Sequence, residues 1–293
     1  MKTPITCKLP RHRWIVVVAL GALCGGEIVA QKKTGAARDA RKNEPDSFEI
    51  CYNPAAPVRQ LAQYSLIVVD YAYPRDAVAV LRKQQKTVLG YLSLGKVHRT
   101  RPFVDQIRRL GIGLVQDRDF PDSFRIDVAD PRWHQLVTRT IIPGMKKAGF
   151  SGLFLDDLDD IGTRKQEKQG VALIRAIRRQ HPDLRLMANR GLEYLADFAR
   201  DVDYSLLESC FVLGGRLRPV SDPDWAIQKL AAGKAANPML VGVAVDYYAR
   251  TGGRLTGEQS ALITRVRELH AKHGLPSCIT TEDLQFLPPL RKN

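Results

Sequence analysis

The residues with the clearest chemical potential lie in the segment Gly149–Asp160. An apolar run ends there in four carboxylates, Asp156, Asp157, Asp159 and Asp160. A short apolar run bounded by glycine is typical of a buried strand, and parallel α/β folds carry their active sites at the carboxyl ends of strands. Because crowded like charges repel one another, we predict that this strand end carries catalytic residues. Strand alternation predicts that Asp156 points into the site and Asp157 away from it.

The last two carboxylates of this segment have a structural alternative. Asp159 and Asp160 precede a predicted helix and could cap it. Both roles stay open for Asp159, whereas capping is the better prediction for Asp160. A divalent metal held by Asp156, Asp157 and Asp159 is a further alternative. Since no His/Asp ligand spacing occurs elsewhere in the chain, the sequence predicts neither a metal nor another cofactor.

A second carboxylate stands at the end of another apolar run. Glu208 follows Tyr204–Leu207, and burying an isolated carboxylate is costly unless it is paired or protonated. A functional role is therefore predicted, with an ion pair to Arg190 as the alternative. Two carboxylates that face one cavity, such as Asp156 and Glu208, meet the requirement for glycoside hydrolysis. No GxSxG or HExxH motif supports a serine hydrolase or a zinc peptidase.

From Phe48 onward, strand-like and helix-like segments alternate along the chain. Eight strands are predicted, over Phe48–Tyr52, Leu66–Asp70, Thr87–Leu94, Gly152–Asp156, Leu184–Asn189, Tyr204–Glu208, Met239–Val245 and Pro276–Thr280. Helices are predicted over Asp76–Gln85, Pro131–Ala148, Gln169–Gln180 and Gly257–His273. Arg125–Val128 is a ninth short apolar run, which we predict to be an extra segment outside the barrel strands, before the fourth strand. This alternation predicts a single (β/α)8 TIM barrel over residues 48–290. A doubly wound open sheet is the alternative, but no glycine-rich phosphate loop follows any strand.

A parallel barrel would bring the polar residues at these strand ends to one face. The predicted substrate-binding residues are Asp70, Tyr71, Tyr91, Lys96, Asp159, Asn189, Arg190, Asp246 and Tyr247. Carboxylates, an amide, a guanidinium and several tyrosines together indicate a carbohydrate site.

The first thirty residues have a basic head followed by the apolar run Trp14–Leu23. This run is shorter than the ~20 apolar residues that span a bilayer. It predicts a cleaved signal peptide over residues 1–30, a flexible linker over 31–47, and a secreted or periplasmic protein with no stable membrane insertion. A lipoprotein at Cys24 and an uncleaved anchor are the alternatives.

The chain carries a formal net charge of +14. Removing residues 1–30 takes away four cationic side chains and Glu27, which leaves +11. Because the lysines and arginines are scattered and have no aromatic residues between them, nucleic acid is not a predicted partner. The predicted partner is a polysaccharide substrate.

Seven segments, in order, resemble glycoside hydrolase family 114. They are Leu66–Tyr71, Val88–Gly95, Ile126–Trp133, Gly149–Asp159, Met187–Gly191, Leu206–Ser209 and Val245–Tyr247. The resemblance runs from Phe48 to Leu287 and implies an endo-α-1,4-polygalactosaminidase-like barrel, similar to hydrolase domains that process Pel-type exopolysaccharide. It also implies that Asp156 and Glu208 are the catalytic pair, with Asp156 expected as nucleophile and Glu208 as acid/base.

One position departs from the family pattern. The family usually carries a glutamate after Gly95, where this chain has Lys96. A cation at the mouth of the site suits a cationic galactosamine polymer less well, and it favours an N-acetylated or anionic glycan. A glycan-binding barrel that has lost catalysis is the alternative function.

Overall fold

The computed structural model describes residues 45–219 and 221–287 of the chain. The predicted signal peptide and most of the predicted linker lie outside the described residues. Ser47, the last residue of that linker, exchanges hydrogen bonds with Ser65, in which each backbone N–H donates to the other's hydroxyl at 3.1 Å. This end of the predicted linker is therefore attached to the start of the second strand.

Eight parallel strands form the centre of the fold, in the order β1-β2-β3-β7-β8-β9-β12-β13. Their bounds are Phe48–Cys51, Leu66–Val69, Thr87–Ser93, Gly152–Asp156, Arg185–Asn189, Tyr204–Glu208, Val241–Ala249 and Ser277–Thr281. Where β1 meets β13, the Tyr52 N–H donates to the Leu284 carbonyl at 2.7 Å and the Cys278 thiol donates to Glu49 at 2.9 Å. The strands thus form a nearly closed barrel, and all eight predicted strands are present.

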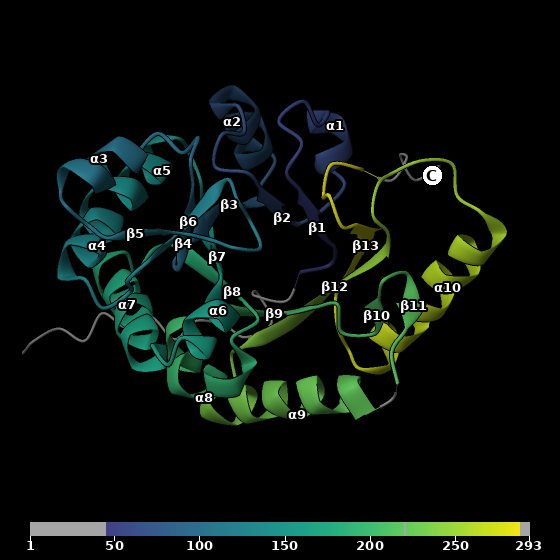
Figure 1. The fold of residues 1–293 in the computed structure, drawn as a ribbon. Helices are drawn as coiled ribbons and strands as arrows, with labels where there is room; N and C mark the ends of the chain where they lie inside the picture. The colour runs from purple at the N-terminus through teal and green to yellow at the C-terminus, as the bar shows by residue number, and fades with distance from the viewer. Residues whose placement is uncertain (1–44, 220, 288–293) are drawn as a thin grey trace, which may run out of the picture. The chain divides into compact units, whose positions relative to one another are not determined.

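Helices surround the barrel (Figure 1). The α-helices are α1 Val58–Leu61, α2 Arg75–Lys83, α3 Val104–Arg109, α4 Pro131–Leu136, α5 Ile142–Lys147, α6 Leu158–Thr163, α7 Glu167–Gln180, α8 Leu195–Phe198, α9 Ser221–Ala236 and α10 Gly257–Lys272. Two 3-10 turns, η3 Leu192–Tyr194 and η4 Ala199–Asp201, flank α8, and the π-helical turn η2 Val137–Ile141 joins α4 to α5. The predicted helices are therefore confirmed. In residues 45–219 and 221–287, no helix is long and apolar enough to cross a membrane.

Two small sheets lie outside the barrel. Strands β4 Lys96–His98, β5 Leu114–Gln116 and β6 Ser123–Ile126 form an antiparallel sheet in the order β4-β6-β5, beside β3 and β7 in Figure 1. This sheet confirms the extra segment predicted at Arg125–Val128, before the fourth barrel strand. A hairpin of β10 Val212–Leu213 and β11 Arg216–Leu217 follows β9.

Strand alternation divides the core into two layers. On β7, Phe154 packs with the residues that fill the barrel, whereas Leu153 and Leu155 pack with the helices. Asp156 has the same parity as Phe154 and therefore lies at the open end of the barrel. Asn189 follows the interior residue Met187 by the same spacing, as Glu208 follows Leu206 on β9. The alternation that builds the core thus also delivers these polar side chains to the mouth.

Candidate active site

The two predicted catalytic carboxylates meet at one amide. Asn189 Nδ2 donates to Asp156 Oδ1 at 2.8 Å and to Glu208 Oε2 at 2.9 Å. Because both distances start at the same nitrogen, these two oxygens are separated by at most the sum of the distances, 5.7 Å. The structure therefore brings Asp156 and Glu208 together with Asn189 between them.

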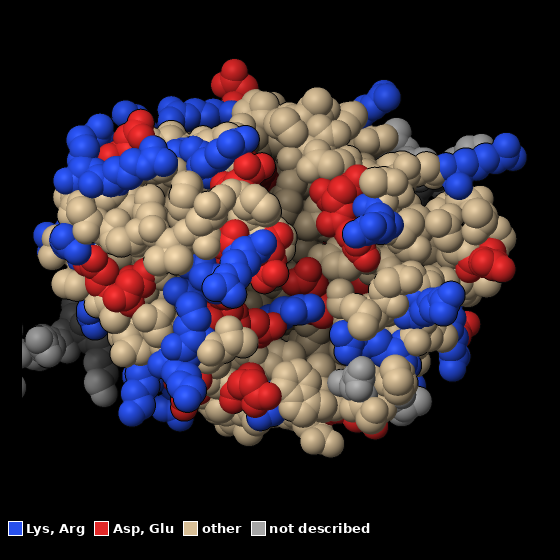
Figure 2. All heavy atoms as spheres, in the orientation of Figure 1, with Lys and Arg blue, Asp and Glu red and all other residues tan. Residues whose placement is uncertain are grey.

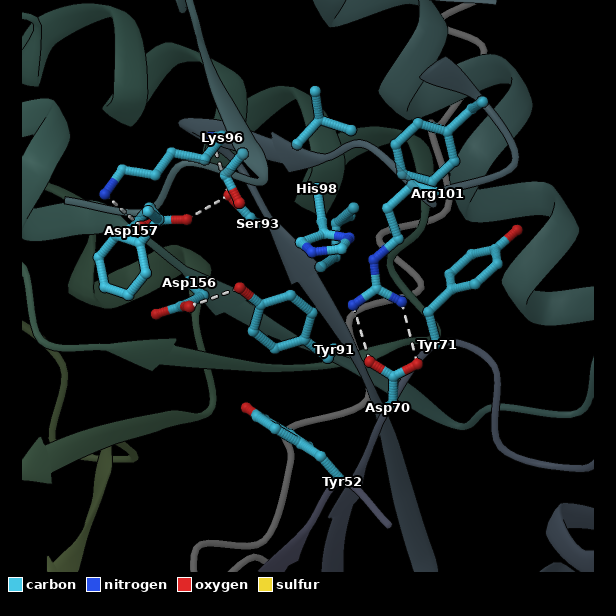
Figure 3. Close-up of a pocket in the computed structure, with 15 residues that line it drawn as sticks. Tyr52, Asp70, Tyr71, Tyr91, Ser93, Lys96, His98, Arg101, Asp156 and Asp157 are labelled. Carbon is cyan, nitrogen blue, oxygen red and sulfur yellow. Dashed lines mark hydrogen bonds and ion pairs between the residues drawn. The ribbon is translucent and has the colours of Figure 1, made fainter. Parts of the chain in front are cut away.

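Two tyrosines satisfy the other carboxylate oxygens. The hydroxyl of Tyr91 donates to Asp156 Oδ2 at 2.7 Å (Figure 3), and that of Tyr247 donates to Glu208 Oε1 at 2.8 Å. Burial and the neighbouring carboxylates raise the pKa of both tyrosines far above the usual range, so both stay protonated donors. The alternative considered for Glu208 also has support, since Arg190 Nε lies 3.5 Å from Glu208 Oε2.

The three strands that carry Asp156, Asn189 and Glu208 end in the same way. The residues directly after Asp156, Asn189 and Glu208 all have left-handed backbones, with φ of 64°, 55° and 52°. For residues other than glycine this conformation costs roughly 1–2 kcal/mol. The chain turns sharply behind each of the three side chains.

This turn makes one prediction wrong, because Asp157 does not point away from the site. The left-handed conformation ends the strand alternation at Asp156, and Asp157 lines the same cavities as Asp156. Its carboxylate accepts from the Ser93 hydroxyl and lies 3.4 Å from Lys96 Nζ (Figure 3). Burial, and next to it the charge of Asp156, raise the pKa of Asp157 to about 7. No group of three or more His, Cys, Asp or Glu in the described residues is arranged to hold a metal ion.

Lys96 reaches the mouth, but carboxylates surround it. Its Nζ lies 3.3 Å from Asp117, 3.4 Å from Asp157 and 4.0 Å from Asp160. Burial opposes the effect, yet these carboxylates raise the pKa of Lys96. The predicted capping role of Asp160 is wrong, because its carboxylate pairs with Lys96 and with Arg164 at 3.1 Å and caps no helix.

Asp159 is not a helix cap either. Its carboxylate accepts from the backbone N–H of Gly191 at 2.8 Å and from Arg190 at 3.2 Å. These bonds tie the loop after β8 to the start of α6. Asp159 also lines the mouth of the barrel together with Arg190.

A second paired cation, Arg101, was missed by sequence reasoning. Its guanidinium binds both oxygens of Asp70, at 2.9 and 2.7 Å, and lies 5.4 Å from the ring of Tyr91 and 5.8 Å from that of Tyr71 (Figure 3). Although burial acts in the opposite direction, Arg101 lowers the pKa of Asp70. No sequence motif indicates Arg101, since it follows β4 of the small antiparallel sheet and not a barrel strand.

Asp246 is the one predicted site residue that the structure does not bring to the mouth. It is 0% exposed, and its carboxylate is bonded to His270 Nε2 at 2.7 Å and to the backbone N–H groups of Phe211 and Val212 at 2.9 and 2.8 Å. On β12 the interior parity belongs to Tyr247. Asp246 therefore faces α10 and anchors the loop after Glu208, and it is not expected to bind substrate.

Three cavities follow one another along the mouth, and we call them together the trough. The central cavity, of about 340 Å³, holds Asp156 and Glu208. A flanking cavity of about 310 Å³ shares Tyr52, Lys96, Phe120, Asp156 and Asp157 with it, and another of about 170 Å³ shares Asp159, Arg190 and Glu208. Figure 2 shows the hollow near the middle of this face, with acidic and basic side chains alternating around it. The carboxylate pair thus lies in the middle of the trough.

Comparisons with known proteins agree with this geometry. The sequence profile of glycoside-hydrolase family GH114 matches residues 29–243. The glycoside hydrolase domain of PelA from Pseudomonas aeruginosa is 25% identical, with a TM-score of 0.70 over 83% of this chain and 98% of that one. Aspergillus fumigatus Ega3, solved with galactosamine, shares the fold at 12% identity, with a TM-score of 0.61 over 81% of this chain and 91% of that one. Among curated proteins, none matches the chain.

Proposed function

Because this chain belongs to glycoside-hydrolase family GH114, we propose that Asp156 and Glu208 are its catalytic pair and that it cleaves a galactosamine-containing exopolysaccharide with retention of configuration. The observation that carries the proposal is the shared bond to Asn189, which holds one oxygen of each carboxylate within 5.7 Å of the other. Carboxyl groups about 5–5.5 Å apart are typical of retaining enzymes, and about 6.5–9.5 Å of inverting ones.

In the proposed mechanism the two carboxyl groups act in sequence. Glu208 gives its proton to the glycosidic oxygen while Asp156 attacks the anomeric carbon, which breaks the glycosidic bond and forms a glycosyl ester. Glu208 then takes a proton from water, and the water oxygen displaces Asp156 from the anomeric carbon. The site regains its starting protonation, and the sugar keeps its anomeric configuration.

Asn189, Tyr91 and Tyr247 position the pair. Each donates to a carboxylate oxygen at 2.7–2.9 Å, and none needs to change its own protonation during the reaction. Fixed donors around reacting carboxylates lower the cost of reorganising the site as charge moves.

The charges of the trough bear on the form of the substrate. Lys96 is surrounded by carboxylates and Arg101 is paired with Asp70, so cations and carboxylates largely neutralise each other there. We propose galactosamine as the sugar because Ega3 was solved with it. A largely neutral trough suits a polymer in which many amino groups are N-acetylated. From the predicted signal peptide we also propose that the activity lies outside the cytoplasm.

The test compares the wild type with Asp156→Asn and Glu208→Gln on a partly N-acetylated galactosamine polymer. Reducing-end release is expected to fall by about 10²–10⁴ in Glu208→Gln, the usual effect of losing an acid–base group, and at least as far in Asp156→Asn, which removes the nucleophile. Asn53→Ala serves as control: it is an amide change shortly after β1 that removes a bond to the Gln285 carbonyl and one from the Ala55 N–H, and Asn53 lines none of the trough. If all variants match the wild type, the assignment fails, and if the wild type binds without releasing reducing ends, the chain is a glycan-binding barrel.

The stereochemistry provides a separate check. Proton NMR during the first turnovers is expected to show the product in the anomeric configuration of the substrate. Inverted product would refute the retaining mechanism and leave the catalytic pair standing.

A further inference from the structure

A tryptophan borders the trough on the side of Glu208. Trp225, on α9, is 43% exposed and lines the 170 Å³ cavity together with Arg190, Ser209 and Glu208. Trp133, by contrast, is 0% exposed. A large aromatic side chain at the rim of a cavity with a few polar groups is the usual composition of a small-ligand site.

We propose that Trp225 forms the wall of a separate sugar-binding subsite, which holds a further sugar ring of the same glycan chain beyond the bond that is cut. This inference rests on the proposed function. The cavity continues from the central one through Asp159, Arg190 and Glu208, so a polymer that passes the catalytic pair reaches the indole next. An indole offers an apolar face to the C–H face of a sugar ring, while Arg190 and Ser209 offer polar groups to its hydroxyls.

The indole is held on a rigid support. Ala226 and Leu230 of α9 are buried, and α9 lies so close to α8 that a methyl group on Gly233 would come within 2.7 Å of Leu195. Binding therefore does not have to order the helix that carries Trp225. A preorganised wall of this kind costs little conformational entropy when a ligand docks.

The charge next to the indole selects the kind of sugar. Lys229 Nζ lies 5.8 Å from the centroid of Trp225 and 2.9 Å from a carboxylate oxygen of Glu193. Because Lys229 already makes the cation–π contact of this ring, a second ammonium group beside the indole would gain little from the ring. The subsite is therefore built for an N-acetylated, uncharged hexosamine better than for a deacetylated one.

An aromatic side chain also borders the trough on its other side. Phe120 is 60% exposed and lines both the central cavity and the 310 Å³ cavity, with Lys96 Nζ 4.9 Å from its ring. Among the large apolar side chains exposed in the described part of the chain, Phe120 and Trp225 are the aromatic ones. Both lie along the trough, as expected if a glycan chain extends to both sides of the catalytic pair.

The first test measures kcat/KM on N-acetylated galactosamine oligosaccharides of increasing length. Trp225→Ala is expected to lower kcat/KM by about tenfold on chains long enough to fill the subsite, with a smaller loss on shorter ones, and Trp225→Phe to restore most of it. Leu255→Ala removes a side chain of similar exposure, 44%, that lines none of the trough, and it should behave as wild type. An equal loss at every chain length, or no loss, would overturn the subsite.

The second test detects binding without hydrolysis. In an Asp156→Asn background, titration with the longest oligosaccharide is expected to change the tryptophan fluorescence, and Trp225→Phe in the same background should abolish that change. If the wild type cleaves the polymer but the signal does not depend on Trp225, the subsite is refuted while the proposed function stands. If the signal depends on Trp225 and no cleavage occurs, the subsite stands and the hydrolase proposal falls.

Discussion

Replacing Asn189 with alanine is the most direct perturbation of the proposed mechanism. The change removes the donor shared by Asp156 Oδ1 and Glu208 Oε2 and leaves Tyr91 and Tyr247 in place. We expect a large loss of kcat with a small change in KM, because the amide contacts the reacting carboxylates.

The expected size follows from the geometry. Hydrogen bonds to charged groups contribute about 1.5–3 kcal/mol each. Losing one hydrogen bond of this strength in the transition state lowers kcat by roughly 10–10², at about 1.4 kcal/mol for each factor of ten.

The assay is reducing-end release at saturating substrate, with the thermal melting of each variant recorded alongside. Asn53→Ala is the matched control, since Asn53 also follows a barrel strand but lines none of the trough. If Asn189→Ala stays within threefold of Asn53→Ala while both remain folded, the bridging amide has no catalytic role and the reasoning is wrong.

Two further predictions concern charge. Burial raises the pKa of Glu49 from 4.5 to about 7, against the opposing bonds from Cys278 and Ile50. Glu49 therefore ionises at lower pH in the unfolded chain than in the folded one, and the wild type should lose up to about 3 kcal/mol of unfolding free energy between pH 4.5 and 7. Urea unfolding of Glu49→Gln should lack this loss. A difference in unfolding free energy between the two proteins that does not change with pH would contradict the prediction. Lys96→Gln adds one net negative charge to the trough and should raise kcat/KM on deacetylated relative to N-acetylated polymer severalfold, about 1 kcal/mol; an unchanged ratio would show that Lys96 does not set this preference.

The period of the strands made most of the fold and part of the site predictable. Apolar residues two apart on β7 and β9 indicated which side chains would reach the mouth, and Asp156 and Glu208 do so. The same rule would have excluded Asp246, because it lies one residue from both Val245 and Tyr247, which carry the interior parity. The residue type of Asp246 suits a carbohydrate site, but its position on β12 does not.

Other features left no readable pattern in the sequence. The partners of Lys96 come from the loop after β5, from the residue after β7 and from α6, and sequence spacing does not pair such distant segments. Trp225 was missed because α9 buries Pro223, Ala226, Leu230 and Gly233, of which only Leu230 is large and apolar. A helix packed through such small residues shows a weak apolar period, so nothing indicated which of its faces would border the trough.

The backbone marks the site independently of the family relationship. Six residues other than glycine have positive φ in the described part of the chain, and three of them directly follow Asp156, Asn189 and Glu208. Strained backbone of this kind persists where the surrounding structure enforces it, and it clusters at functional sites. Because β7, β8 and β9 are neighbours, the three turns carry the main chain away behind one carboxylate–amide–carboxylate row. The conformational free energy of three left-handed residues is thus spent where the proposed reaction needs three side chains held side by side.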